Sequence, residues 1–207
     1  SFLNLKVPFG NLIFRCRNDD FDFSFGIEIC EDLWAPIPPS SYMGINGVDL
    51  VANPSASNGL VGKTEYRTQL VSQQSARCLA GYIYAGAGVH ESTTDTVFEG
   101  ESMIFENGKE LCKSESFKRG PELTYTEIDL QKLESEKRQN TTLSDNFNFA
   151  ANDTEFKEIE FKFQTTPSIS SYTSLNREFE PLPFVPSNKD VRNERCKEIF
   201  NIQASGL

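Results

Sequence analysis

The sequence predicts an α/β fold in which strands alternate with helices around one sheet. Apolar residues occupy every second position from Phe21 to Ile29, which is the period of a strand with one buried face. Residues 48–53 form a short apolar run typical of a buried strand, and residues 64–80 carry apolar or small side chains at helical spacing. A strand, a crossover and a second strand in this order are the building unit of α/β sheets.

The first strand is predicted to end at Cys30, because the prolines at positions 36–39 cannot continue a strand ladder. A helical turn follows, capped by Ser40 or Ser41 and ending near Gly47, and it leads into the strand over 48–53. The remaining predicted elements are a helix over 64–80 stopped by Gly81, a strand over 82–88, a hairpin over 102–112 turning at Asn107-Gly108, a strand over 123–129, a helix over 130–139, a strand over 156–163 and a helix over 190–205 capped by Ser187 or Asn188.

The composition shift near the C-terminus predicts two parts. Residues 1–163 carry the alternating elements and form the main domain, whereas residues 164–207 form a linker and one closing helix. The linker is polar and rich in Ser and Thr over 165–180, and three prolines stiffen it before the helix. At 207 residues the chain is long enough for one good core and an appendage.

Charge and cysteine usage exclude several classes of protein. The formal net charge of −10 disfavours binding to nucleic acid or to an anionic membrane, since both select for clustered Lys and Arg. No apolar run approaches the roughly 20 residues that span a bilayer. The five cysteines are widely scattered without the paired spacing of a disulfide frame or a zinc site, so we expect a reducing, cytoplasmic location and no metal.

Cys30 is the first candidate for chemistry, because it follows a strand and opens an acidic turn. Strand ends of this kind are where open α/β sheets place their active sites. A reactive cysteine needs nearby positive charge or helix amides to form the thiolate, and none is visible in the local sequence. On local pattern alone, a cysteine in this position is more often a small buried apolar residue than a nucleophile.

A set of ordered motifs resembles the nitrilase (carbon–nitrogen hydrolase) superfamily, and specifically the glutaminase domain of the glutamine-dependent NAD synthetase family. The resemblance covers most of the chain. The motifs are Cys30-Glu-Asp-Leu-Trp followed by the proline-rich residues 36–41, Asn53-Pro-Ser-Ala-Ser57, Ser-Ala-Arg-Cys-Leu-Ala at 75–80, Glu-Ser-Thr-Thr-Asp at 91–95, Pro-Phe-Val-Pro at 183–186 and the helix over 195–203.

The resemblance implies a partial α-β-β-α nitrilase-type sandwich, with the C-terminal linker and helix leading toward a synthetase domain. It implies that Cys30 attacks glutamine to form a γ-glutamyl thioester and that the ammonia released serves amidation of deamido-NAD. The family's catalytic Glu and Lys precede the cysteine motif, and no residue among the 29 before Cys30 matches them. We therefore expect the chain to be part of a longer enzyme, inactive by itself, with apolar sheet surface left uncovered.

The resemblance also implies substrate-binding roles for Glu31, Ser57 and Lys63. A free glutamine needs a carboxylate for its α-ammonium group and a cation for its α-carboxylate. Lys63 departs from the family's usual Arg, which weakens that assignment because Lys lacks the bidentate fork. Without the resemblance, Glu31 and Asp32 read as a helix-capping pair and Lys63 as a solvated residue of a first helical turn.

Competing interpretations stay open at this point. His90 is the only histidine, so a papain-like Cys30–His90 pair is one alternative, and a solvated loop histidine is the other. The chain as a whole has two further alternatives, a stand-alone nitrilase-type amidase and a non-catalytic assembly fragment. The predicted partners are glutamine, the synthetase domain of the same polypeptide and a second copy in a homo-oligomer. No cofactor is expected in this chain, and ATP with magnesium is expected only at the synthetase domain, whose pyrophosphate loop is not found among residues 1–207.

Overall fold

The computed structural model describes residues 3–18, 21–150, 155–162, 175, 177, 179, 185 and 188–206. The chain divides into two compact units, residues 1–172 and 173–207, and each is described by itself. The predicted domain boundary at 163/164 falls at the edge of a stretch outside the described residues and stays a prediction. Across the described ranges, no helix is long and apolar enough to cross a lipid bilayer.

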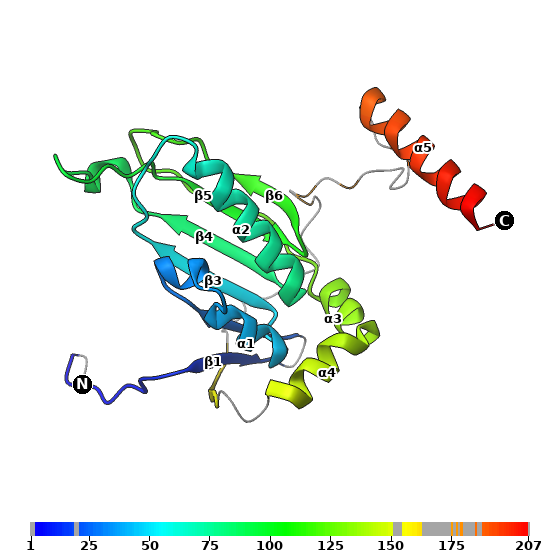
Figure 1. Cartoon of the computed structure of the whole chain (residues 1–207). Coiled ribbons are helices and arrows are strands. Elements are labelled where there is room, and N and C mark those ends of the chain that lie inside the picture. The colour runs from blue at the N-terminus through cyan, green and yellow to red at the C-terminus, as the bar shows by residue number, and fades with distance from the viewer. Residues whose placement is uncertain are drawn as a thin grey trace. The chain divides into compact units, whose positions relative to one another are not determined.

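The first unit is built on a seven-stranded mixed sheet in the order β6-β5-β4-β3-β2-β1-β7 (Figure 1). The three central strands β2, β3 and β4 are parallel, so their carboxyl ends meet at one edge of the sheet. The bounds are β1 (Leu12–Arg17), β2 (Asp22–Ile27), β3 (Leu50–Ser55), β4 (Gly81–Gly86), β5 (Ser102–Glu106), β6 (Lys109–Lys113) and β7 (Lys157–Phe161).

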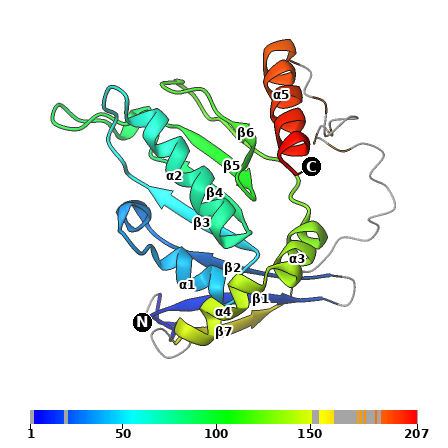
Figure 2. The same cartoon turned by 45° about the vertical axis from the view of Figure 1, so that its right-hand side comes forward.

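Helices α1 and α2 lie across the same face of this sheet in both views (Figures 1 and 2). The buried core fills the space between them and includes Val51, Val71, Tyr82 and Met103. The helical elements of the first unit are η1 (Cys30–Trp34), α1 (Pro39–Ile45), α2 (Lys63–Cys78), η2 (Val89–Glu91), α3 (Leu130–Gln139) and α4 (Thr141–Ala150).

The second unit contributes α5 (Lys189–Ser205), which matches the predicted closing helix. Asn188 caps it, because its side-chain oxygen accepts hydrogen bonds from the backbone N–H groups of Asp190 and Val191. The predicted linker over 165–180 lies almost wholly outside the described residues.

Two elements differ from the sequence prediction. Residues 123–129 are not a strand, because this segment crosses the ends of the sheet's strands instead of pairing along one. Ile128 packs over Gly81 and Leu50, and the Asp129 N–H donates to the Glu106 carboxylate. Helix α4 was not predicted; Asn140 caps it by accepting a hydrogen bond from the N–H of Leu143.

Several predicted ends also move by a few residues. Helix α1 begins at Pro39 with Pro38 as its N-cap, not Ser40 or Ser41, because Pro39 pre-sets the helical φ of the first turn. Helix α2 ends at Cys78, where Leu79 takes a left-handed φ of 48°, and Gly81 instead opens strand β4. The hairpin at Asn107-Gly108 and helix α3 match the prediction.

The alternation in β2 predicted the strand correctly but its buried face wrongly. The face that α1 and α2 cover carries Ser24 and Gly26, and a Cβ at Gly26 would lie 2.5 Å from the Met43 sulfur of α1. The phenylalanines point to the opposite face, where they pack on one another: Phe14 stacks on Phe25 at 4.8 Å between ring centroids. Close helix packing therefore selected the small residues for the covered face.

The face opposite the helices carries an apolar surface that none of the described residues covers. Its side chains are half-buried, or exposed in the case of Ile27 at 44%. The paired register places on this face Phe14, Phe23, Phe25, Ile27, Ile83 and Phe161. A contiguous apolar surface of this kind marks a contact site for further protein.

Expressed by itself, the chain is expected to bind the apolar dye ANS while still unfolding in a cooperative thermal transition. The dye should bind because the phenylalanine face offers apolar surface that a closed core would hide. Dye fluorescence and the thermal transition would be measured on the same monomeric fraction. A folded monomer that leaves the dye fluorescence unchanged would contradict this expectation.

Candidate active site

The candidate site lies at the carboxyl ends of the parallel strands β2 and β3. After β2 ends at Ile27, two residues lead to Cys30, and after β3 ends at Ser55 the chain continues into the 56–62 loop. Both segments reach the same edge because the strands are parallel. The prediction that Cys30 is the last residue of the strand is therefore wrong. Cys30 is the first residue of η1, three positions beyond the end of β2.

A pocket of about 340 Å³ opens at this edge. It brings together all four residues singled out from the sequence, so the prediction that Cys30 faces a pocket also lined by Ser57 is confirmed. The remaining lining residues come from η1, the 56–62 loop and the 92–101 loop. The complete lining is Cys30, Glu31, Trp34, Ala56, Ser57, Asn58, Lys63 and Thr96.

Cys30 has an unusual backbone, with φ at +52°. This left-handed region is sterically costly for a residue with a side chain and is seen mostly where surrounding structure enforces it. The side-chain amide of Asn53 on β3 holds the Cys30 peptide groups. Its oxygen accepts from the Cys30 N–H at 3.0 Å, and its nitrogen lies 3.4 Å from the Cys30 carbonyl oxygen.

The acidic pair after Cys30 divides into one structural residue and one pocket residue. Asp32 accepts a hydrogen bond from the Ile29 N–H at 2.7 Å and so caps η1. Glu31 is exposed and lines the pocket. The capping interpretation therefore holds for Asp32, and Glu31 remains the candidate for a ligand contact.

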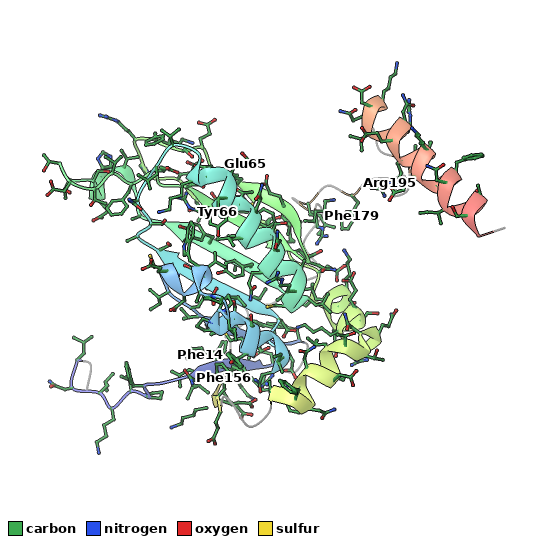
Figure 3. The ribbon with its side chains drawn as sticks, viewed as in Figure 1. Phe14, Glu65, Tyr66, Phe156, Phe179 and Arg195 are labelled. Atoms are coloured by element: carbon green, nitrogen blue, oxygen red, sulfur yellow. The ribbon has the colours of Figure 1, made fainter. Side chains whose placement is uncertain are left out.

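Lys63 is the first residue of α2 and is half-buried at the pocket wall. Its Nζ lies 2.5 Å from the Asn58 side-chain oxygen and 5.1 Å from the centroid of the Trp34 ring. Tyr66, labelled on the same helix in Figure 3, packs against Trp34 at 5.2 Å between ring centroids. These contacts hold the ammonium group over the pocket, unlike the solvated lysine of the alternative interpretation.

A buried ion cluster, which no local sequence pattern indicates, joins α2 to the loop that contributes Thr96 to the pocket. The Arg67 guanidinium of α2 lies 3.1 Å from Glu99 and 2.8 Å from Glu101, and all three side chains are at most 5% exposed. Glu99 also accepts a hydrogen bond from the Thr64 hydroxyl. Burial opposes the charge of Arg67, but Tyr84 and the two carboxylates outweigh it and raise the Arg67 pKa.

This cluster ties the 92–101 loop to the first turns of α2. The loop contributes Thr96 to the pocket, directly after the motif at 91–95, and no residue of that motif itself lines the pocket. The two carboxylates lie 32 and 34 residues from Arg67, so no local pattern connects them. Trp34, by contrast, closes the motif that begins at Cys30, and Asn58 directly follows the motif at 53–57. The sequence motifs did not assign either residue to the pocket.

Two other features bear on the competing interpretations. His90 is exposed on η2 and does not line the pocket, so the structure does not bring it together with Cys30. Cys78 is 3% exposed, and burial, with a smaller effect of Glu28, raises its pKa to about 12. A thiol of that pKa stays protonated at neutral pH, in agreement with a packing role.

The chain is similar to curated proteins over nearly its full length. It is 38% identical over 205 residues, 99% of the chain, to the glutamine-dependent NAD(+) synthetase of Mycobacterium leprae. It is 30% identical over 131 residues, 62% of the chain, to the human glutamine-dependent NAD(+) synthetase. The chain is a homologue of part of the glutamine-dependent NAD(+) synthetases. It spans about 30% of the length of the mycobacterial relative and 18% of the human one. No protein-family model matches the chain.

Solved structures agree with the sequence relatives on the fold. The carbon–nitrogen hydrolase of Helicobacter pylori matches 64% of this chain and 50% of its own, with a TM-score of 0.50 and 20% identity. The sheet and its helices thus share the fold of this carbon–nitrogen hydrolase, as predicted. The resemblance to the glutamine-dependent NAD synthetases, stated on sequence motifs, is confirmed by the curated relatives.

Proposed function

We propose that this chain supplies the nucleophile and substrate pocket of the glutaminase site in a glutamine-dependent NAD(+) synthetase. The observation that carries the proposal is the pocket itself, which Cys30 lines together with one carboxylate residue, Glu31, and one ammonium residue, Lys63. A thiol in one pocket with two opposite charges suits a substrate with an amide at one end and a zwitterionic α-carbon at the other.

The reaction would proceed in two steps. The Cys30 thiolate attacks the glutamine side-chain carbonyl carbon, the C–N bond breaks and ammonia leaves, giving a γ-glutamyl thioester. Water then attacks the thioester carbon, the C–S bond breaks, and glutamate and the free thiol are restored. Ammonia is the product that a second site of the synthetase would consume.

Within the pocket, Glu31 would bind the α-ammonium group of glutamine and Lys63 its α-carboxylate, with Ser57 as a further polar contact. Lys63 offers one point charge, and its hydrogen bond to Asn58 orients that charge in place of an arginine fork. The Trp34 ring beneath Lys63 restricts the same side chain from a second direction.

The base that takes the thiol proton and the lysine that stabilises the oxyanion are not assigned to residues 1–207. We propose that other parts of the enzyme supply them, and that ATP and magnesium act at its synthetase site. The described residues hold no cluster of three His, Cys, Asp or Glu side chains suited to a metal, so no metal step is assigned to them. The five free cysteines fit a reducing, cytoplasmic location. We also propose that the intact enzyme assembles as a homo-oligomer.

A glutamine-analogue electrophile, such as a diazo ketone of glutamine, is expected to modify Cys30 in preference to the other four cysteines of the intact protein. At pH 8 a thiol of pKa about 12, such as Cys78, is a thiolate in only about one molecule in ten thousand. Burial and Glu110 also raise the pKa of Cys112. Peptide mass mapping would locate the label, with Cys30→Ala as the control.

Excess glutamine should slow the labelling of Cys30 if the electrophile enters through the substrate pocket. Label found mainly on Cys78 or Cys112, or labelling of Cys30 that glutamine does not slow, would contradict the proposed site. Glu31→Gln and Lys63→Met variants should each weaken the protection by glutamine without removing the thiol.

A further inference from the structure

A continuous chain of buried hydrogen bonds reaches the Cys30 backbone from three neighbouring segments of the sheet. It begins at Glu28, which is 1% exposed just after β2, and runs through Tyr82 on β4 to Asn53 on β3. Tyr82 and Asn53 are themselves at most 1% exposed. All three side chains lie on the helix-covered face, and none of them lines the pocket.

The direction of every hydrogen bond in this chain follows from the chemistry of its first member. One Glu28 oxygen accepts from the Ser40 N–H at 2.8 Å, and the other accepts from the Tyr82 hydroxyl. A phenol has a single proton, so its oxygen is left to accept, and the Asn53 NH₂ group donates to it at 3.0 Å. The Asn53 oxygen must then face the Cys30 N–H.

The chain therefore fixes which way the Asn53 amide points. In the opposite orientation its NH₂ group would face the Cys30 N–H, two donors without an acceptor in a buried site. Burial and the Glu28 charge raise the Tyr82 pKa, so the hydroxyl keeps its proton. The strained left-handed peptide at Cys30 thus has a defined partner.

We propose that Glu28, Tyr82 and Asn53 are positioning residues that hold the Cys30 backbone in its left-handed conformation and so aim the thiol into the pocket. This inference deepens the proposed function and rests on it for the role of Cys30 as nucleophile. Tyr82 and Glu28 act only through Asn53, at a distance from the substrate.

Tyr82→Phe and Glu28→Gln test the chain in the intact protein with nearly unchanged side-chain shape. Phenylalanine removes the hydroxyl between Asn53 and Glu28. Glutamine has one acceptor oxygen in place of two, so it cannot accept from both the Ser40 N–H and the Tyr82 hydroxyl. Each variant is expected to lower kcat for glutamine hydrolysis, and the rate of Cys30 alkylation by iodoacetamide, about 10- to 100-fold, with KM changed less than about 3-fold.

The double variant Glu28→Gln/Tyr82→Phe should be no slower than the worse single variant, because both changes break the same chain. Ser75→Ala is the matched control: its hydroxyl is also buried, donating to the Ala80 carbonyl and accepting from the Gly108 N–H, but it lies outside this chain. It should lower Tm as Tyr82→Phe does and leave kcat and alkylation unchanged.

The two measurements separate this inference from the proposed function. Iodoacetamide lacks the α-ammonium and α-carboxylate groups of glutamine, so its rate reports the placement of the Cys30 thiol without the contacts proposed for Glu31 and Lys63. Glutamine hydrolysis that survives Cys30→Ala would overturn the proposed function and with it the nucleophile role on which this inference rests. Alkylation and kcat in Tyr82→Phe within about twofold of wild type, at a lowered Tm, would overturn the positioning chain alone.

Discussion

Replacing Arg67 with methionine is expected to destabilise the first unit by about 3–5 kcal/mol, a large share of the 5–15 kcal/mol that typically holds a domain together. The substitution leaves the Glu99 and Glu101 carboxylates, at 5% and 1% exposure, without their guanidinium partner, and Glu101 keeps only the Lys113 ammonium group at 2.8 Å. Methionine fills much of the same volume, so the loss comes from the lost charge compensation, at Glu99 above all, and not from a cavity. Urea unfolding followed by circular dichroism would measure it.

Arg138→Met is the matched control, since it makes the same substitution in an exposed ion pair. Arg138 on α3 lies 2.5 Å from Glu134, with the two side chains 76% and 57% exposed. Exposed pairs of this kind contribute little, so its unfolding midpoint should stay near wild type. Adding Glu99→Gln and Glu101→Gln to Arg67→Met should recover part of the stability. Equal effects of the two arginine substitutions would show that the buried cluster is not compensating charge.

The consequence for function follows from where the cluster sits. Glu99 accepts hydrogen bonds from Thr64 and Arg67 in the first turns of α2, and a Cβ at Gly59 would lie 2.7 Å from its carboxylate. The cluster therefore joins α2, the 56–62 loop and the 92–101 loop, which together line most of the pocket. A site made from loops keeps its geometry only when such buried contacts hold the loops on rigid elements.

The elements that the sequence predicted well are those with a strong local signal. Asn107-Gly108 has the left-handed φ values of a tight turn, and α3 spans the predicted residues because Asp129 caps it. The segment at 123–129 has strand-like alternation but joins no ladder, and Ile128 packs over Gly81 instead, so tertiary packing decided its path. Period alone does not distinguish these two cases.

The face of β2 shows why periodicity identifies a strand but not its covered side. In a two-sided sheet, either set of alternating residues can face the helices. Here α1 approaches closely enough that a Cβ at Gly26 would lie 2.5 Å from the Met43 sulfur, and the larger phenylalanines take the other face. The decisive quantity is the space between layers, which a single sequence does not state.

The candidate site was predictable only in part, and for different reasons at each residue. Cys30 was a candidate because it follows a predicted strand. Ser57 and Lys63 lie 27 and 33 positions farther along the chain, and only the family resemblance connected them to Cys30. The supporting residues Arg67, Asn53 and Tyr82 act through buried partners on other strands or loops. Such partners are set by the topology of the sheet, so the local sequence carries no mark of them.

Tested by itself, the 207-residue chain is expected to release no measurable glutamate from glutamine. The proposed mechanism needs a base for the Cys30 proton and a charged partner for the oxyanion, and neither is assigned to residues 1–207. A general base contributes about 10²- to 10⁴-fold and one oxyanion donor about 10²- to 10³-fold, so their joint loss lowers the rate by about 10⁴- to 10⁷-fold. A coupled glutamate assay on the purified, folded chain would measure the release.

The pocket supplies the two residues that would have to act if the chain were active. Glu31 and Lys63 line it beside Cys30, and the proposal uses their charges to bind glutamine and not to move the thiol proton. Glutamate release that Cys30→Ala abolishes would contradict the expectation. A further loss of kcat at unchanged KM in Glu31→Gln or Lys63→Met would then identify that residue as the missing base or oxyanion partner, whereas a raised KM alone would leave it a binding residue.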